Sequence, residues 1–110
     1  DISHIKIKLD YEWGNANFQK TTENIIFRVI EETVTNSLRH GHATKIWIKC
    51  TSNNSSYILS IHNNGKSETH IKPGYGITQM RERLTIINGT VEFDGKKGFT
   101  TVVKFPKVGV

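Results

Sequence analysis

One long segment with the periodicity of a helix limits what this chain can fold into more than any other feature of its sequence. From about Lys20 to His40, apolar residues recur every three or four positions, as the burial of one helix face requires. They are Ile25, Ile26, Val29, Ile30, Val34 and Leu38. Such a helix must bury its apolar stripe against a second layer, which the rest of the chain has to supply.

The segments around this helix have the pattern of strands. From His4 to Tyr11, apolar and polar residues alternate, which predicts a half-buried strand. After the helix, strands are predicted over 45–51 and 57–62, and the polar turn between them indicates a hairpin.

The second half of the chain repeats this change of period. Apolar residues at Ile77, Met80, Leu84 and Ile87 predict a shorter helix that ends at Asn88 and Gly89. Strands over 90–93 and 100–105 then form a second hairpin around the turn at 94–98.

This order of elements predicts the fold class. A strand, a long helix, a hairpin, a loop, a helix and a hairpin give an α/β (α+β) two-layer sandwich. Its mixed, mostly antiparallel sheet of about five strands carries the helices on one face. With 110 residues and no repeat or linker, the chain is expected to be a single domain over residues 1–110.

Composition excludes several classes of function. The net charge of +5 favours an anionic partner, but the lysines are scattered, so we expect no nucleic-acid binding. No segment is apolar enough to span a membrane, and we expect no direct membrane contact. The single cysteine, Cys50, excludes an internal disulfide and suits a reducing, cytoplasmic location, where it is expected to be a core residue.

The first candidate site lies on the long helix, where Glu32, Asn36 and His40 are spaced four apart and share one face. A carboxylate can hold or polarise water, and an amide oxygen is a ligand that Mg²⁺ accepts. By spacing alone, the alternative of a solvated helix edge stays open.

Two loops are the other candidates. Asn63 and Gly65 follow a strand, and the Asn63 amide offers a donor and an acceptor to a flat heterocycle. The segment Gly74-Tyr75-Gly76-Ile77 opens a helix whose free N–H groups form an anion site. Each segment alone also fits an ordinary turn.

Taken in this order, the three segments resemble the GHKL ATPases, which have the Bergerat ATP-binding fold. The nearest resemblance is to the catalytic domain of sensor histidine kinases that signal to helix-turn-helix (NarL-like) response regulators. The motif of the N-box helix and next strand is FRVIEETVTNSLRHGHATKIWI, and that of the second glycine box is GYGITQMRERL. The resemblance covers nearly the whole chain.

The resemblance assigns roles to single residues. Glu32 corresponds to the catalytic acidic residue of the N-box, and Asn36 to the residue that holds Mg²⁺ against the ATP phosphates. Arg39 and His40 would flank the phosphates. The remaining ATP-binding residues implied are Asn63, Gly65, Gly74, Tyr75, Gly76 and Ile77, with residues 66–73 as a short lid.

Two positions depart from the family pattern. The aspartate that reads adenine is Asn63 here, which keeps an acceptor and loses the charge. The threonine that supports it is replaced by Phe99, and Thr100 or Thr101 is a possible substitute. A charge-assisted hydrogen bond contributes about 1.5 to 3 kcal/mol against about 1 for a neutral one, so ATP affinity is expected to fall roughly tenfold.

The resemblance implies a protein histidine kinase that uses ATP and Mg²⁺. Its partners would be a histidine-containing dimerisation domain and, through the full-length protein, a response regulator. The parent protein would be anchored in the membrane, if at all, through an upstream region. Because the acceptor domain is absent, this fragment is not expected to autophosphorylate. A pseudokinase that binds ATP weakly or not at all, and a GHKL protein serine kinase, are the alternatives.

Overall fold

The computed structural model of the protein describes residues 5–39, 42–65 and 76–107. The elements in chain order are β1 (Lys6–Tyr11), α1 (Lys20–Arg39), β2 (Lys45–Ser52), β3 (Ser56–Asn63), α2 (Gly76–Thr85), β4 (Thr90–Asp94) and β5 (Phe99–Pro106). The predicted order of strands and helices is therefore confirmed.

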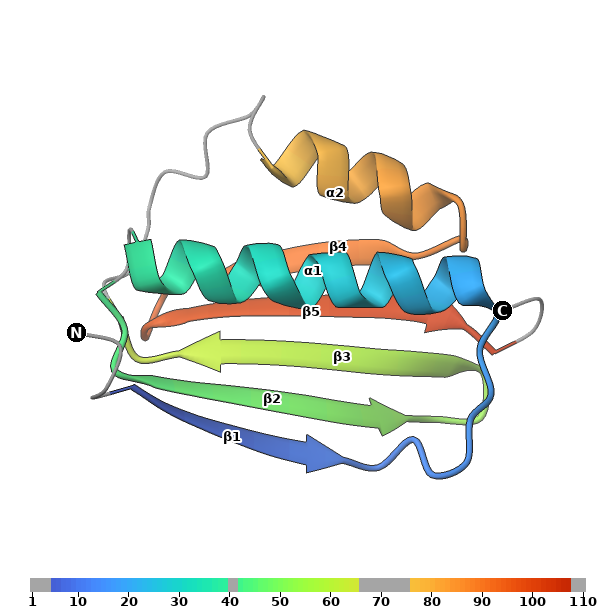
Figure 1. Ribbon diagram of the computed structural model, residues 1–110, viewed down its shortest axis with the longest axis horizontal. Helices are drawn as coiled ribbons and strands as arrows, with labels where there is room; N and C mark the ends of the chain where they lie inside the picture. The colour runs from blue at the N-terminus through green and yellow to red at the C-terminus, as the bar shows by residue number, and fades with distance from the viewer. Residues whose placement is uncertain (1–4, 40–41, 66–75, 108–110) are drawn as a thin grey trace.

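The five strands form one sheet in the order β1-β2-β3-β5-β4. β1 pairs with β2 in parallel, and the other three pairs of neighbours are antiparallel. The two helices lie on one face of the sheet and run in opposite directions (Figure 1). The predicted two-layer α+β sandwich with a mixed, mostly antiparallel sheet is thus confirmed.

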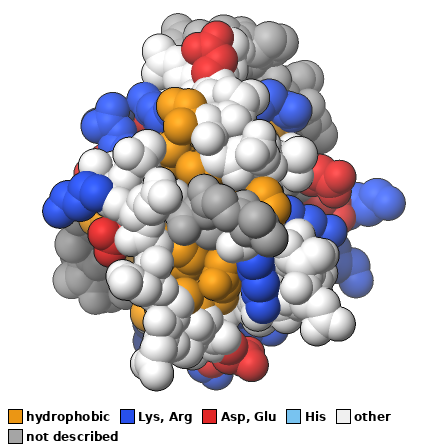
Figure 2. Space-filling view, turned by 90° about the vertical axis from the view of Figure 1, so that its right-hand side faces the viewer, with side chains coloured by type: hydrophobic (Ala, Val, Ile, Leu, Met, Phe, Trp, Pro, Cys, Tyr) orange, Lys and Arg blue, Asp and Glu red, His pale blue; other side chains and the backbone are white. Residues whose placement is uncertain are grey.

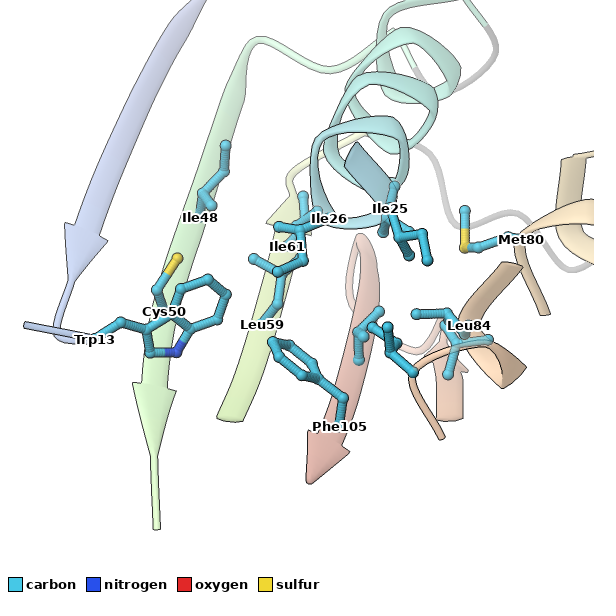
Figure 3. Packing of buried hydrophobic residues seen from close by; sticks show 14 of the residues in the cluster. Trp13, Ile25, Ile26, Ile48, Cys50, Leu59, Ile61, Met80, Leu84 and Phe105 are labelled. Atoms are coloured by element: carbon cyan, nitrogen blue, oxygen red, sulfur yellow. The ribbon is translucent and has the colours of Figure 1, made fainter. Parts of the chain in front are cut away.

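The core lies between the helices and the inner face of β2, β3, β4 and β5. Leu59, Ile61, Val103 and Phe105 are almost fully buried on the sheet side (Figure 3). From the helices they meet Ile25, Ile26 and Val29 of α1 and Met80 and Leu84 of α2. Cys50 is buried in this core, as predicted, and burial raises the pKa of its thiol.

An aromatic cluster closes one end of this core. Trp13 packs edge to face against Phe18, Tyr57 and Phe105, with ring centroids 5.4 to 5.8 Å apart. The indole nitrogen of Trp13 also donates a hydrogen bond of 2.6 Å to the carbonyl oxygen of Thr51. This end of the molecule carries a band of hydrophobic side chains between polar ones (Figure 2).

The expected half-burial of the first strand is wrong. All six residues of β1 are exposed, including Ile7, Leu9 and Tyr11, whose exposed fractions are 54%, 59% and 53%. β1 is the edge strand, and α1 packs over the middle of the sheet, at β3. The alternating pattern therefore predicts correctly that Ile7, Leu9 and Tyr11 share one face of the sheet. The helices do not cover this part of that face.

The buried face of α1 also differs from the apolar stripe in the sequence. Thr22, Thr33 and Ser37 are buried along with Ile25, Ile26 and Val29. Ile30, Val34 and Leu38 are only partly buried. Compared with the stripe predicted from the sequence, the face of α1 that meets the sheet therefore includes more residues with hydroxyl groups. Two of them, Thr33 and Ser37, belong to the candidate site described below. Neither helix in the described part of the chain is long and apolar enough to cross a membrane.

Candidate functional site

Asn63 is the centre of the candidate site, at the point where β3 ends beneath α1. Its side chain is buried, with an exposed fraction of 3%. The amide nitrogen donates a hydrogen bond of 2.8 Å to the Ser37 hydroxyl, which in turn donates 2.8 Å to the carbonyl oxygen of Thr33. The amide oxygen accepts 2.8 Å from the N–H of Gly65. The side chain thus joins α1 to the start of the next loop.

These contacts fix which way the Asn63 amide faces. The Gly65 N–H can only donate, so it requires the amide oxygen. Because the Ser37 hydroxyl already donates to Thr33, it must accept from the amide nitrogen. Among the contacts of the described residues, one N–H hydrogen and one oxygen lone pair of Asn63 have no partner, and recognition of a heterocycle edge needs one donor and one acceptor.

Two buried hydroxyl groups near Asn63 have no hydrogen-bond partner in the described structure. They belong to Thr33, one helical turn before Ser37, and to Thr101 of β5. Phe99 pairs in register with Asn63, and Thr101 pairs with Ile61. Thr101 is therefore on the same face of the sheet as Asn63, two residues along β5 from the residue opposite Asn63. A buried polar group without a partner costs about 1 to 3 kcal/mol, so each hydroxyl is suited to a ligand or a water molecule.

The structure also distinguishes the two threonines that were expected to replace the family's supporting threonine. The Thr100 hydroxyl lies 2.7 Å from Nδ1 of His62 and therefore belongs to the opposite face of the sheet. Thr101 is buried on the helix side with Asn63. The Phe99 ring stacks on Phe93 at 5.8 Å, at the side of the site.

The backbone at Asn63 is enclosed by the turn before β5. Gly98 has a φ of +69°, and a Cβ atom there would lie 2.1 Å from the carbonyl oxygen of Asn63. Only glycine allows the turn to approach so closely. The Asn63 main chain is therefore held by Gly98 while its side chain is held by Ser37.

Glu32 lies beside α2, where its carboxylate pairs with Arg83. Oε1 is 2.7 Å from Nη1 of Arg83, and both side chains are one-quarter exposed. The other oxygen, Oε2, is buried and has no partner in the described structure. Arg83 therefore neutralises the carboxylate and orients it, while one oxygen stays available for a further donor.

Four other predicted site residues, Asn36, Arg39, Gly76 and Ile77, lie toward the same end of the molecule. Asn36 and Arg39 are exposed on the last turns of α1, and α2 begins at Gly76 and Ile77 near that end (Figure 1). His40, Gly74 and Tyr75 lie outside the described residues, as does the predicted lid over 66–73. Glu32, Asn63 and Gly65 are thus positioned with their contacts, and Asn36, Arg39, Gly76 and Ile77 are placed only along their elements.

Three residues with direct contacts to the site were missed in the sequence: Thr33, Ser37 and Arg83. A signal existed for Thr33 and Ser37, which are spaced four apart on the helix and therefore share a face. Arg83 was part of the Met-Arg-Glu-Arg motif, but nothing in its spacing indicated a contact with Glu32.

The similarity of the chain to known proteins agrees with this geometry. No family model matches the chain. It is 29% identical over 89 residues to the Sensor protein VraS of Staphylococcus aureus and equally to that of Staphylococcus epidermidis. Each match covers 78% of this chain and 26% of the relative, so the chain spans about a quarter of the sensor proteins that it matches.

Solved structures with the same fold include histidine kinases. The Acinetobacter baumannii histidine kinase AdeS superposes with a TM-score of 0.81 at 15% identity, covering 98% of this chain and 57% of that chain. The blue-light activated histidine kinase of Erythrobacter litoralis EL346 gives 0.81 at 13% identity, covering 96% and 39%. The ATP binding domain of PrrB from Mycobacterium tuberculosis gives 0.69 at 14% identity, covering 91% and 79%.

Proposed function

We propose that this chain, which belongs to the ATP-binding catalytic domains of sensor histidine kinases, binds ATP with Mg²⁺ and presents the γ-phosphate to a histidine on a separate helical domain. The observation that carries the proposal is the buried Asn63 amide. It is held by Ser37 and Gly65. Within the described residues, one donor and one acceptor of this amide have no partner, and neither do the buried hydroxyls of Thr33 and Thr101. A purine base satisfies such a set of groups, since its edge carries both donors and acceptors.

The phosphates are proposed to lie beyond the base, at the end where α1 finishes and α2 begins. Arg39 and His40 would flank them with side-chain donors, and Gly74, Tyr75, Gly76 and Ile77 would offer backbone N–H groups. The N–H groups of a helix N-terminus and the helix dipole both favour an anion there. This arrangement would position the γ-phosphate without covalent chemistry by the protein.

Glu32 is the proposed catalytic residue. Its paired oxygen is fixed by Arg83, and its other oxygen, Oε2, which is buried and has no partner in the described structure, would have to become accessible to accept a hydrogen bond from the attacking imidazole. A carboxylate in this role orients the nucleophile and takes up its proton. Arg83 is then a positioning residue, since it acts through Glu32.

The side chains at this end fit a magnesium ion. Asn36 offers an exposed amide oxygen one helical turn after Glu32, and oxygen atoms are the ligands that Mg²⁺ prefers. Asn36 would hold the ion, which supplies charge neutralisation on the phosphates. The parent protein would act in the cytoplasm, with a dimerisation domain and a response regulator as its partners.

A second candidate function is a regulatory module that binds nucleotide weakly. Asn63 favours it, because a neutral amide gives a weaker hydrogen bond to a base than a carboxylate does. Intact Glu32 and Asn36 favour the kinase instead.

Calorimetric titration of the purified fragment with ATP, with and without MgCl₂, tests the proposal. We expect saturable binding that needs Mg²⁺ and that weakens in Asn36→Ala. Asn24→Ala is the matched control, since Asn24 is an exposed asparagine on the first turns of the same helix. Equal binding by both variants, or no binding by the unchanged fragment, would contradict the proposed site.

Transfer to a histidine is tested separately. The fragment is mixed with radiolabelled ATP and an isolated dimerisation domain from a related sensor kinase, and phosphohistidine is measured. We expect slow labelling that Glu32→Gln abolishes without loss of ATP binding. Weak ATP binding with no transfer to any such domain would favour the regulatory module.

A further inference from the structure

The edge strand β1 presents three kinds of binding group that the proposed kinase function does not use. Its six residues are all exposed, and within residues 5–39, 42–65 and 76–107 it has a neighbouring strand on one side only, β2. One face of the strand is apolar, the other is basic, and the free edge carries unpaired backbone groups. Figure 1 shows β1 along the border of the sheet, away from α1.

The apolar face consists of Ile7, Leu9 and Tyr11. They pair in register with Ile46, Ile48 and Cys50 of β2, which are buried, so all six side chains point to the helix side of the sheet. Each of the three on β1 is nevertheless more than half exposed. The rings of Tyr11 and Trp13 pack edge to face with their centroids 5.9 Å apart, and this contact fixes one end of the stripe.

The opposite face of the same strands is basic. Lys6 and Lys8 of β1 lie next to Lys45 and Lys49 of β2, and all four are exposed. Lys6 is directly opposite Lys45, a like-charged pair that destabilises a sheet. One acidic residue, Asp10, lies opposite Lys49. No salt bridge involves these lysines in the described part of the chain.

The backbone of the apolar residues points outward. The N–H of Lys6 donates to Thr44 and that of Glu12 to Cys50, so the even-numbered residues face β2. Because successive residues of a strand alternate, the N–H and C=O groups of Ile7, Leu9 and Tyr11 face away from the sheet. They are free to pair with an additional strand.

We propose that β1 docks an extended segment of a partner protein in which acidic and apolar residues alternate. As an added strand, this segment would bond to the outward backbone groups of β1. Its acidic side chains would lie beside the lysines, and its apolar side chains beside the Ile7–Tyr11 stripe.

Charge selects this partner over two others. A second copy of the chain would bring lysine against lysine, because edge lysines repel identical strands. A flat anionic membrane could attract the lysines, but it would leave the apolar stripe on the other face of the sheet in water. Of these three partners, only an added strand with acidic and apolar side chains can contact the apolar face, the basic face and the free backbone edge of β1 at once.

Fluorescence anisotropy tests the proposal with a labelled peptide in which glutamate alternates with valine. We expect saturable binding that weakens with salt and is lost when lysine replaces glutamate in the peptide. The double variant Lys6→Glu/Lys8→Glu should weaken binding by about tenfold or more. Lys104→Glu is the matched control, since Lys104 is exposed on β5, beyond β2 and β3 in the sheet.

Amide hydrogen exchange tests the strand pairing in the unchanged protein. Bound peptide should slow exchange at Ile7, Leu9 and Tyr11, while Lys6 and Lys8, which already face β2, should change little. Binding without this alternation, equal binding of a peptide with the same residues in shuffled order, or tighter binding to anionic vesicles than to the peptide would each overturn the proposal.

Discussion

Replacement of Asn63 by aspartate tests how the candidate site reads its ligand. In the unliganded protein the new carboxylate keeps the hydrogen bond from the Gly65 N–H. Its second oxygen replaces the amide nitrogen, 2.8 Å from the Ser37 hydroxyl. Ser37 must then turn its hydrogen from the Thr33 carbonyl to the carboxylate. The hydrogen bond between position 63 and Ser37 is therefore kept with its direction reversed, and the hydrogen bond from Ser37 to Thr33 is lost.

The size of the effect follows from this exchange. Two charge-assisted hydrogen bonds, at about 1.5 to 3 kcal/mol each, replace two neutral ones at about 1 kcal/mol. Loss of hydration by a buried carboxylate costs several kcal/mol. We expect the unliganded variant to be destabilised by about 1 to 3 kcal/mol. A base N–H that meets a carboxylate instead of an amide should gain about 1.5 kcal/mol, which is roughly tenfold in the Kd for ATP.

Calorimetry with Mg-ATP and urea denaturation measure the two effects on one pair of variants. Asn64→Asp is the matched control, because Asn64 is exposed and its amide oxygen accepts from the N–H groups of Thr44 and Lys45. We expect the control to leave the ATP affinity unchanged. If Asn63→Asp folds and its ATP affinity stays the same or falls, then the side-chain oxygen at position 63 does not accept a hydrogen bond from a base N–H, and the proposed orientation of the nucleotide is wrong.

Further substitutions test the contacts around the site and in the core by urea denaturation. Arg83→Gln should lower the free energy of unfolding by only about 0.5 to 1 kcal/mol, because its ion pair is partly exposed, while it slows phosphotransfer; a larger loss of stability would indicate a structural role. Gly98→Ala should cost about 2 kcal/mol or more, since its Cβ would meet the Asn63 carbonyl; Gly14→Ala, with a φ of +62° and open space, should cost about 1. Phe105→Ala should cost about 3 to 5 kcal/mol, and a smaller value would mean that the aromatic cluster repacks.

The order of elements was predictable because the period of the apolar residues changes clearly along the chain. Strand alternation gives way to helical spacing near Lys20 and returns near Lys45, as the structure has it. The burial of β1 was not predictable in the same way. Alternation shows that a strand has two different faces, but the reach of the helix layer depends on where α1 packs. That position is set by contacts between residues far apart in the sequence.

The candidate site was predictable only where a motif names a residue. Glu32 and Asn63 came from motifs, and the structure gives both of them specific partners. Those partners are Arg83 and Ser37, which lie 51 and 26 positions away in the chain. Local spacing carries no information on such pairs. Gly98 is similar, since its need for a positive φ is apparent only once the turn is seen against Asn63.

The residues around Asn63 fit an amide better than a carboxylate in the unliganded protein. Ser37 donates to Thr33 and so accepts from Asn63, which requires a donor at position 63. Two further hydroxyls, at Thr33 and Thr101, are left without partners. A degenerate site that had lost its ligand would be expected to fill with apolar side chains, because unpartnered buried hydroxyls cost stability. The hydroxyls of Thr33 and Thr101, which have no partner in the described structure, together with the Asn63 amide therefore favour a site that binds a polar ligand.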